Sequence, residues 1–552
     1  MPTITHQVFN QVPPLHGDNL FDSDLVLREA LTREGAAASE AALLALGARL
    51  GREEVRELGT LANREAPRLH AFDANGYRID SVEFHPAWHA LIAMLRDQGV
   101  HCSAWSDERP GGHVARAAAF FLHGQIEAGS LCPITMTFAA IPVLRRETEL
   151  FASISRQVLS REHDANDLPL DGKRSAMIGM GMTEKQGGSD VRSNTTTARP
   201  LSHPGRGARY ALVGHKWFFS APMCDAHLVL ARTDDALSCF YVPRWREDGT
   251  RNSVHLQRLK DKLGNRSNAS SEVEFDDAEG ILVGEPGRGI NTIIEMASYT
   301  RLDCVLGSAA LMRQALVQAL HHTSHRQAFG KRLIEQPLMT NVLTDVALES
   351  EAATTLALRL ARACERAASD LLERALWRII TPAAKFWVCK RAIDVMGECM
   401  EVLGGNGYVE EGPLARLYRE APVNSIWEGS GNVMCLDVLR ALRREPDAAD
   451  ALWAYLGDAH AGDADAMSAI ARAHRLTAAG DEFVARDLAR TLVLLVQSAL
   501  LKYSAPLAVA EGFIGSRLRN ATRGRDAFGM LDGAMPVASI LQRAWQPGLP
   551  RT

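Results

Sequence analysis

The chain has 552 residues, of which 46% are hydrophobic and 23% charged, and its formal net charge is −5 at pH 7. This composition is typical of a globular protein with room for three or four compact domains. Because phosphate binding draws on lysine and arginine, the negative charge excludes nucleic-acid binding through an overall positive excess. Any nucleic-acid contact would need a local basic patch.

Targeting signals and cysteine usage favour a cytoplasmic protein. The first fifteen residues contain no basic region followed by an apolar run, so no signal peptide is expected. The most apolar helical stretch, residues 491–501, is too short to cross a bilayer. The nine cysteines form no C-x-x-C pair and have no zinc-finger spacing. Reduced, buried thiols are therefore expected, with no membrane segment and no bound metal.

Hydrophobic periodicity separates helical from β segments along the chain. After a polar arm, apolar side chains recur every three or four residues from 25 to about 160, which predicts helices. From about residue 176, short β-rich runs alternate with turn residues. The expected strands are 210–213, 216–219, 227–231, 237–242 and 272–275. After the glycine-rich turn 284–289, helices are expected to continue through the rest of the chain.

This segregation of helices and strands favours an α+β fold over a doubly wound sheet. Four parts are expected: an N-terminal arm with a helical domain, a middle β domain, a helical bundle, and an additional C-terminal helical domain. Their boundaries are placed at residues 1–175, 176–290, 291–440 and 441–552.

Several familiar motifs are missing from the sequence. It has neither G-x-G-x-x-G after a strand nor G-x-x-x-x-G-K-[ST], so the Rossmann and P-loop ways of holding phosphates are excluded. Residues 429–431 lack the G-x-S-x-G spacing of a serine hydrolase. His321 and His325 would share a helix face, but without a carboxylate at matching spacing a solvated helix end is favoured over a metal site.

Three other segments are harder to explain as scaffold alone. Residues 182–191 form a glycine- and hydroxyl-rich loop that can approach an anion or a heteroaromatic edge, although it is also an ordinary turn. Residues 216–220 offer aromatic faces beside a hydroxyl, which suits a flat ring but is also common in core strands. In residues 426–432, Glu428 is either a base among apolar and small residues or a helix N-cap.

Five motifs in succession resemble the acyl-CoA dehydrogenase superfamily, over residues 80 to about 440. They are residues 182–191, 214–220, 301–311 with 325–333, 402–411, and 426–432. The resemblance implies the fold of that superfamily, with an N-terminal helical domain, a middle β-barrel or sheet domain and a C-terminal four-helix bundle. It also implies that the cofactor is FAD.

The resemblance further implies which residues contact FAD. In the middle domain these are Met182, Thr183, Gly188, Ser189, Phe218, Phe219 and Ser220, with the Ser220 hydroxyl near flavin N5. The FAD of a neighbouring subunit would be reached by Arg326 and Phe329, together with the loop Leu403, Gly404 and Gly405. The flavin side of the site would be lined by Ile426, Trp427, Gly429, Ser430 and Asn432.

The same resemblance implies oxidation of an acyl thioester, with Glu428 as the catalytic base. Glu428 would remove the α-proton while the β-hydrogen leaves as hydride to the flavin. Thr300 stands where some members of the superfamily carry an alternative base, so Glu428 has no rival carboxylate there. Lys185, Ser220 and Ser430 replace the common Pro, Thr and Thr, and the two serines keep the hydroxyl.

Further stretches resemble a DNA-associated branch of the superfamily that takes part in the response to DNA alkylation. They are residues 10–24, 131–140, 259–270 and 422–432, together with a segment after Arg440 that ordinary short-chain members lack. This likeness implies a homotetramer, binding of double-stranded DNA, and only weak dehydrogenase activity toward a branched acyl-CoA such as isovaleryl-CoA.

A basic patch in the last segment is the expected site of phosphate contacts. Its arginines are Arg517, Arg519, Arg523 and Arg525, and Arg440, just before this segment, is also expected to contact DNA. A solvated loop is the competing interpretation. The sequence contains no recognition-helix, homeodomain or zinc-finger signature, so binding would be non-specific, dominated by phosphates and weakened by salt.

Two other functions stay open at this point. A metabolic acyl-CoA dehydrogenase would use Glu428 for catalysis and the segment 441–552 only as an oligomer interface. A non-enzymatic DNA-binding protein would keep FAD as a structural group. Rapid oxidation of one acyl-CoA without DNA binding would indicate the first, and a cellular phenotype unchanged by Glu428→Gln would indicate the second.

Overall fold

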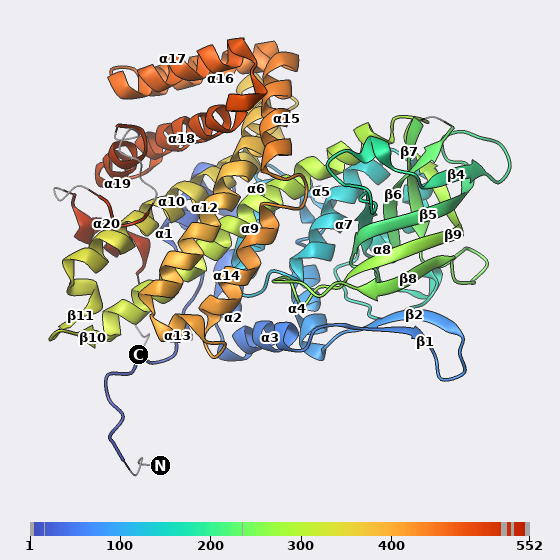
Figure 1. Cartoon of the computed structure of the whole chain (residues 1–552), viewed down its shortest axis with the longest axis horizontal. Helices are drawn as coiled ribbons and strands as arrows, with labels where there is room; N and C mark the ends of the chain where they lie inside the picture. The colour runs from blue at the N-terminus through green and yellow to red at the C-terminus, as the bar shows by residue number, and fades with distance from the viewer. Residues whose placement is uncertain (1–4, 16, 235, 520–526, 532–534, 547–552) are drawn as a thin grey trace. The chain divides into compact units, whose positions relative to one another are not determined.

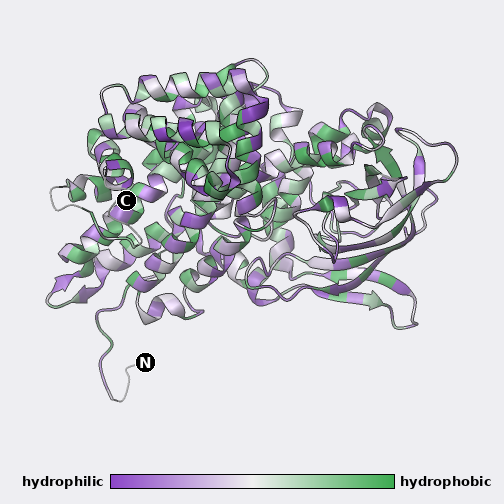
Figure 2. Cartoon of the chain, turned by 45° about the horizontal axis from the view of Figure 1, so that its top comes forward, coloured by the Kyte–Doolittle hydropathy of each residue, from purple (hydrophilic) through white to green (hydrophobic). Residues whose placement is uncertain are grey.

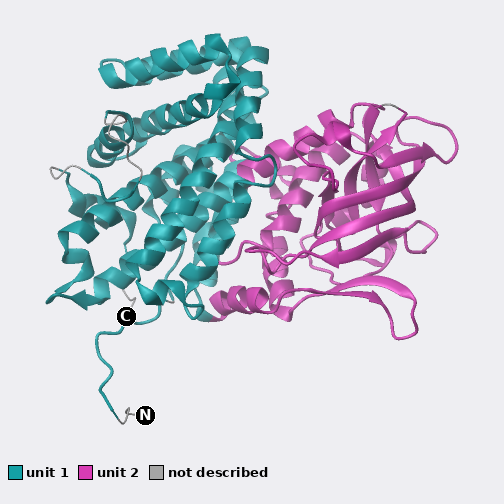
Figure 3. Cartoon of the chain, in the orientation of Figure 1, with its two compact units in different colours: residues 1–53, 113–125, 304–552 teal, residues 54–112, 126–303 magenta. Residues whose placement is uncertain are grey.

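The structure is a computed structural model, and it describes residues 5–15, 17–234, 236–519, 527–531 and 535–546. The chain divides into two compact units, which Figure 3 distinguishes by colour. Unit 1 comprises residues 1–53, 113–125 and 304–552, and unit 2 comprises residues 54–112 and 126–303. The segment 1–175 is thus divided between the two units.

Unit 2 contains a β-sheet whose pairings form a ring (Figure 1). Its strands are β3 (Ile178–Gly181), β4 (Thr197–Pro200), β5 (Arg209–Ser220), β6 (Ala226–Thr233), β7 (Ala236–Pro243), β8 (Val254–Leu259) and β9 (Ser270–Val283). The order is β3-β6-β4-β5-β9-β7, with β7 also paired to β6 and β8 paired to β9. A core of aromatic and aliphatic side chains, including Phe219, Val229, Phe240 and Phe275, holds the sheet together.

The end of β5 carries the aromatic motif predicted from the sequence. β5 pairs antiparallel with β9, and the pairing shifts register between Lys216 and Phe219. Such an irregularity changes which side chains face the core. Lys216 and Phe219 are buried, whereas the Phe218 side chain between them is 52% exposed.

A β-hairpin corrects the expectation of helices throughout residues 25 to about 160. Strands β1 (Arg68–Phe72) and β2 (Arg78–Glu83) are antiparallel and interrupt the helices. Their turn is closed by Asp73, whose carboxylate accepts from the backbone N–H of Asn75 and of Tyr77, both at 2.9 Å. The Asn75-Gly76 pair was the available turn signal, because Gly76 adopts φ +86°.

Helices complete unit 2. They are α3 (Glu53–Arg64), α4 (Pro86–Asp97), α5 (Ser103–Ser106), α7 (Leu131–Leu144) and α8 (Thr148–Val158). The fully buried Arg96 of α4 joins three segments, because its guanidinium donates to four backbone carbonyls. These belong to Gln157, Ser160, Glu162 and Ala176.

Unit 1 is helical apart from a short hairpin, β10 (Gln327–Ala328) and β11 (Lys331–Arg332). Its helices up to residue 444 are α1 (Leu25–Arg33), α2 (Glu40–Leu50), α6 (Gly112–Gly124), α9 (Gly289–His325, which begins in unit 2), α10 (Pro337–Arg366), α11 (Leu371–Ala375), α12 (Thr381–Val402), α13 (Gly405–Tyr408), α14 (Pro413–Asn424) and α15 (Gly431–Arg444). The segment beyond adds α16 (Pro446–Ala459), α17 (Ala464–Ala479), α18 (Ala485–Ser504), α19 (Leu507–Ile514) and α20 (Val537–Ala544).

The additional helices pack into unit 1. α12 contacts α14, α15 and α18, while α18 also contacts α10, so the apolar stretch 491–501 is buried in the bundle. Figure 2 shows hydrophobic and hydrophilic residues interspersed along these helices, the pattern of amphipathic helices in a bundle. Among the described residues, no helix has the length and apolar character needed to span a bilayer.

These observations confirm the α+β class and most of the predicted elements. The five expected strands lie within β5, β6, β7 and β9, and the long helix α9 follows the glycine-rich turn 284–289. Three strands of the sheet, β3, β4 and β8, had not been predicted, and the β10–β11 hairpin corrects the expectation of helices alone after residue 289. The nine cysteines are unpaired, and eight of them are buried, as expected.

Candidate active site

Two of the predicted motifs lie together in unit 2. The loop 182–191 and the end of β5 are joined by backbone contacts: Trp217 N donates to Thr183 O at 2.8 Å, and Lys185 N donates to His215 Nε2 at 3.1 Å. These bonds place the hydroxyl-bearing loop beside the aromatic strand. The sequence motifs, about thirty residues apart, therefore form one site.

A buried ion pair between Lys216 and Glu184 holds the loop 182–191 against β5. The Lys216 ammonium lies 2.6 Å from the Glu184 carboxylate, which also accepts from the backbone N–H of Thr195 and of Thr196. Burial acts to raise the pKa of Glu184, but Lys216 and the hydrogen bonds lower that pKa to about 2. The carboxylate is charged at neutral pH and holds the loop in one geometry.

The two phenylalanines of the motif have different roles. Phe218 is half-exposed beside the loop, so its ring is available to a ligand. Phe219 is 1% exposed, lies in the sheet core and stacks on His227 with 3.8 Å between ring centroids. The predicted FAD contact through the Phe219 side chain is therefore corrected: the register shift in β5 turns this ring into the core.

The loop 182–191 and residues 216–220 at the end of β5, which we call the half-site in unit 2, carry side chains that fit a flavin. Among the described residues, the hydroxyls of Thr183, Ser189 and Ser220 have no hydrogen-bond partner, so they are free to bind the polar rim of a ring. The Phe218 ring offers a flat apolar face beside them. Gly188 keeps the loop open, because a Cβ at this position would come within 2.6 Å of Thr183 Oγ1.

Cations gather around the neighbouring indole of Trp217. Lys260 Nζ lies 3.3 Å from the ring centroid, and Lys185 Nζ and the Arg258 guanidinium carbon each lie 5.7 Å from it. Two of these three cations are engaged, because Arg258 and Lys260 both pair with the Glu272 carboxylate, at 2.7 and 2.5 Å.

The predicted base, Glu428, lies in unit 1, in the tight turn between α14 and α15. Its φ of +59° is a left-handed conformation that costs a non-glycine residue about 1–2 kcal/mol, and Gly429 follows with φ +105°. The fully buried Lys385 of α12 supports the turn: its ammonium donates to Trp427 O at 2.6 Å and to Gly429 O. The Glu428 side chain is half-buried.

Contacts at both ends of this turn decide between the two interpretations of Glu428. Ser430, not Glu428, is the N-cap residue of α15, so the N-cap interpretation is wrong. Trp427 Nε1 donates to Asn424 Oδ1 at 3.1 Å, and Asn432 Oδ1 accepts from Arg486 Nε at 2.8 Å. Because Arg486 belongs to α18, the additional segment contributes directly to the support of this turn. Ile426, also predicted to line the site, is exposed.

The residues predicted to reach a neighbouring subunit lie elsewhere in unit 1. Phe329, at the tip of the β10–β11 hairpin, is 98% exposed. Arg326 donates to Asn10 O and thereby ties the hairpin to the N-terminal arm. Leu403 is half-buried, and the adjacent Gly404 and Gly405 are exposed where α12 ends and α13 begins.

The structure contradicts the prediction that Arg517 belongs to an exposed basic patch. This side chain is 11% exposed and donates to the carboxylates of Asp345 and, at 3.0 Å, of Glu349 on α10. Its charge and its donors are thus engaged inside unit 1. The sequence pattern missed this because the two carboxylates lie more than 160 residues away along the chain.

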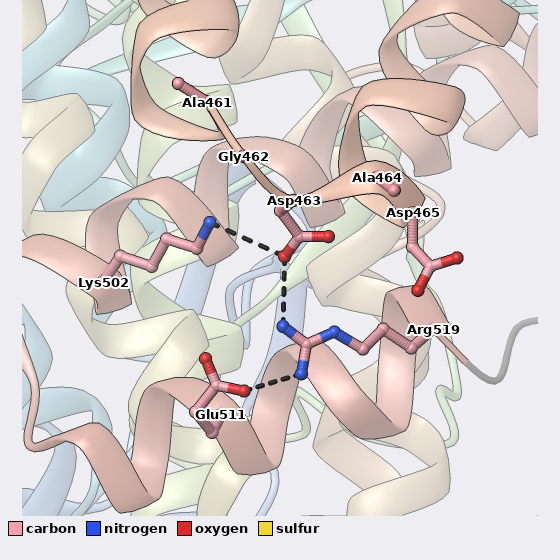
Figure 4. A pocket seen from close by; sticks show the side chains of 8 residues that line it. All are labelled: Ala461, Gly462, Asp463, Ala464, Asp465, Lys502, Glu511 and Arg519. Carbon is pink, nitrogen blue, oxygen red and sulfur yellow. Dashed lines mark hydrogen bonds and ion pairs between the residues drawn. The ribbon is translucent and has the colours of Figure 1, made fainter.

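Arg519 is also engaged by carboxylates. It donates to Glu511 at 2.6 Å and to Asp463 at 3.2 Å in a polar pocket that Lys502 also lines (Figure 4). Arg523 and Arg525 lie outside the described residues. These contacts leave little positive charge free around Arg519.

Arg440, the remaining described arginine of those predicted to contact DNA, lies on a basic surface at the C-terminal end of α15. The side chain of Arg440 is 54% exposed, and Arg443 and Arg444 are exposed as well. Spacings of three and four residues place all three on one side of the helix. Arg440 contacts Asp437 at 3.4 Å, and Arg443 donates to Gly480 O at 2.7 Å.

Three supporting residues had not been singled out from the sequence: Glu184, Lys385 and Arg486. Glu184 and Lys216 were inside recognised motifs, and the alternation of β5 could have indicated that Lys216 points inward and needs an anion. Lys385 and Arg486 are remote in sequence from the turn that they support. Among the described residues, no group of three or more His, Cys, Asp or Glu side chains could hold a metal ion.

Comparisons with known proteins agree with these features. Family models match three stretches: the adaptive response protein AidB N-terminal domain (residues 10–165), the acyl-CoA dehydrogenase middle domain (179–278) and the acyl-CoA dehydrogenase C-terminal domain (287–443). The chain is 52% identical over 506 residues to AidB of Escherichia coli (strain K12), named as an acyl-CoA dehydrogenase, covering 91% of this chain and 92% of that one.

Two nematode comparisons extend the similarity. Acyl-CoA dehydrogenase family member 11 of Caenorhabditis elegans is 32% identical over 402 residues, covering 70% of this chain and 64% of that protein. The crystal structure of Caenorhabditis elegans ACDH-11 in complex with C11-CoA superimposes with a TM-score of 0.82 at 27% identity. It covers 99% of this chain and 94% of that one.

Proposed function

The chain belongs to the acyl-CoA dehydrogenase family, in the branch of AidB, and from this membership we propose that it oxidises a branched acyl-CoA slowly and binds double-stranded DNA in the response to DNA alkylation. It is an acyl-CoA dehydrogenase-type oxidoreductase, and its cofactor is FAD. The observation that carries the enzymatic proposal is the turn that holds Glu428 at a left-handed φ by means of a buried lysine.

In the proposed reaction, Glu428 takes the proton from the α-carbon of an acyl thioester such as isovaleryl-CoA. When bound, FAD would supply the acceptor for the hydride that leaves the β-carbon, so that the α- and β-carbons would become joined by a double bond. The hydroxyls of Thr183 and Ser220 and the ring of Phe218 orient the flavin. The buried pair beneath the loop keeps these groups fixed, which lowers the cost of reorganisation during the reaction.

An anaerobic titration of the FAD-loaded protein with isovaleryl-CoA tests this assignment. We expect slow loss of flavin absorbance in the wild type, and a loss slowed by about 100- to 10,000-fold in Glu428→Gln, because a general base contributes about that factor. Glu410→Gln, at an exposed carboxylate of the same unit paired with Arg419, is the matched control. Bleaching of Glu428→Gln at the wild-type rate would remove Glu428 as the base.

DNA binding is proposed at the end of α15, through Arg440, Arg443 and Arg444. Their common orientation and exposure support phosphate contacts: Arg440 contacts one carboxylate, that of Asp437 at 3.4 Å, whereas Arg517 and Arg519 each pair with two. The description of the N-terminal family model as an adaptive response protein supports the role in DNA alkylation. Cells lacking this protein should lose survival after a methylating agent, and expression of the wild-type chain should restore it.

A homotetramer is proposed as the assembly. The 98% exposure of Phe329, at the tip of a hairpin tied to the N-terminal arm, supports a contact with a neighbouring subunit. Sedimentation equilibrium tests it: a Phe329→Asp variant should shift the assembly toward smaller species.

A metabolic dehydrogenase in which residues 441–552 serve only assembly is the second candidate. The burial of α18 against α10 and α12 favours it, because that burial already gives the segment a structural role. Fast oxidation of one acyl-CoA together with no retention on DNA at moderate salt would select this candidate.

A further inference from the structure

We propose that Lys385 is the positioning residue for Glu428, holding the base by binding the carbonyl oxygens of the residues on either side of it. This inference rests on the proposed role of Glu428 as the base. It adds that the orientation of Glu428 depends on a cation outside the motif 426–432. That cation is the Lys385 ammonium, which belongs to helix α12.

The environment of Lys385 indicates a dedicated role. The side chain is fully buried, and among the described residues it has no carboxylate partner. Its two hydrogen bonds go to backbone carbonyls, those of Trp427 and Gly429. Burying a charge is costly unless it is hydrogen-bonded, so an apolar side chain would suit mere packing better here.

The turn needs such a support. Glu428 and Gly429 adopt consecutive left-handed conformations, a geometry that persists only where the surroundings enforce it. The two carbonyls lie between the end of α14 at Asn424 and the start of α15 at Gly431, outside the regular hydrogen bonding of either helix. By binding both, Lys385 fixes the peptide group that precedes Glu428 and the one that follows Gly429, so Glu428 and Gly429 between them are held at both ends.

The effect should fall on catalysis rather than on ligand binding. Without the ammonium, the turn can relax toward ordinary backbone angles, which moves the Glu428 carboxylate from its place. A displacement of about 1 Å in a reacting group costs about 100-fold in rate. Because Trp427 and Gly429 are also expected to line the flavin, FAD content is measured in each variant and the rate is compared per bound flavin; the rate should fall far more than FAD retention or the KM for the acyl-CoA changes.

The test compares Lys385→Met with Lys502→Met in the FAD-loaded protein. Lys502 donates to the carbonyl of Ala459 at 3.4 Å and also pairs with Asp463 at 3.7 Å, so Lys502→Met controls for the loss of a partly buried lysine far along the chain from the turn. Hydrogen exchange of the peptide covering residues 425–431 is measured first. We expect faster exchange in this peptide in Lys385→Met only, with the rest of unit 1 unchanged.

Rapid-reaction bleaching by isovaleryl-CoA is measured next. Lys385→Met should lower the limiting rate by about 100-fold at a nearly unchanged KM, and it should add less than about twofold in a Glu428→Gln background, because residues that act through one group are not additive. A full effect in both backgrounds, or unchanged exchange of the 425–431 peptide, overturns the proposal.

A second variant, Lys385→Arg, keeps the proposal testable if Lys385→Met does not fold. Lys385→Arg keeps a buried cation with several donors, and it should restore part of the rate lost in Lys385→Met, or carry a smaller change in exchange if Lys385→Met does not fold. Equal defects in both variants overturn the positioning role. If Glu428→Gln alone leaves bleaching unchanged, the proposed function of Glu428 as the base fails instead. The hydrogen-exchange measurement still tests whether Lys385 holds the 425–431 turn.

Discussion

The Lys216 ammonium and the Glu184 carboxylate meet at 2.6 Å, and neither side chain is exposed to solvent. The pair connects the loop 182–191 to β5 and so joins the hydroxyl groups of the site to its aromatic face. An ion pair of this kind is more informative about geometry than about net stability, since desolvation offsets much of the attraction.

Lys216→Met should therefore be strongly destabilising, because it leaves the Glu184 carboxylate buried without its cation. We expect a loss of about 3–5 kcal/mol in the free energy of unfolding, together with weaker FAD retention. Urea denaturation and FAD release under dilution measure the two effects. Lys331→Met, at an exposed position of β11, is the control. Unfolding of Lys216→Met at the wild-type urea concentration would contradict this expectation.

Acid should destabilise unit 2 through His227. Burial lowers the pKa of this histidine from 6.5 to about 3, so the unfolded chain takes up the proton first. The contribution of His227 to the free energy of unfolding is complete above pH 6.5. It falls by about 1.4 kcal/mol per pH unit as the pH drops toward 3. Urea midpoints at pH 7, 6 and 5 should fall less steeply in His227→Gln than in the wild type. Parallel pH profiles for the two proteins would count against this linkage.

The two phenylalanines of the aromatic motif should separate binding from stability. Phe219→Ala opens a cavity in the sheet core and should cost about 3–5 kcal/mol of unfolding free energy. Phe218→Ala removes a half-exposed ring and should weaken FAD binding while leaving the thermal midpoint of the apoprotein nearly unchanged. Fluorescence titration with FAD and calorimetry of the apoprotein distinguish them. An identical loss of stability in both variants would contradict the assignment of Phe218 to the ligand face.

Removing Arg440 and Arg444 together should weaken binding of duplex DNA and flatten its salt dependence. Each phosphate that is no longer neutralised by an arginine reduces the steepness of log K against log salt concentration by about 0.9. Fluorescence anisotropy with a labelled duplex at several salt concentrations measures it. Arg199→Ala, at an exposed arginine of unit 2, is the control. A slope that stays the same in the double variant would place the DNA surface elsewhere.

Arg517→Ala should act on the fold instead. It removes the arginine partner of Asp345 and leaves Glu349 with Arg391 alone, and because both carboxylates are buried in α10 it should cost about 3–5 kcal/mol of unfolding free energy. Chemical denaturation measures this loss. Weaker DNA binding at wild-type stability would show that the side chain leaves its pocket to meet phosphate.

The sequence was most informative where local pattern decides structure. Alternating apolar residues located the long strands, and the glycine-rich turn located the start of α9. The β1–β2 hairpin was missed because helical periodicity on both sides outweighed the Asn75-Gly76 turn. Motif order indicated the loop, the aromatic strand and Glu428 as parts of a site.

Partners brought together by tertiary packing could not be predicted in this way. Lys385 binds a carbonyl 42 residues further along the chain, and Arg517 binds a carboxylate 168 residues before it. The clustering of arginines after residue 516 suggested that they are solvated or bind phosphate. Counting charges along a segment does not reveal which side chains are buried against other helices. The register shift that buries Phe219 is likewise a property of the β5–β9 pairing.

The arginines of the last segment make it inseparable from the bundle. Arg517 pairs with Asp345 and Glu349, and Arg543 pairs with Glu351 at 2.9 Å, so three buried carboxylates of α10 are neutralised from beyond residue 441. A chain cut after residue 440 would leave Asp345 and Glu351 without their arginine partners and Glu349 with Arg391 alone. Conversely, grafting the segment onto a shorter relative would require those acidic positions to be installed in the recipient helix first. The extension and its host helix therefore have to change together.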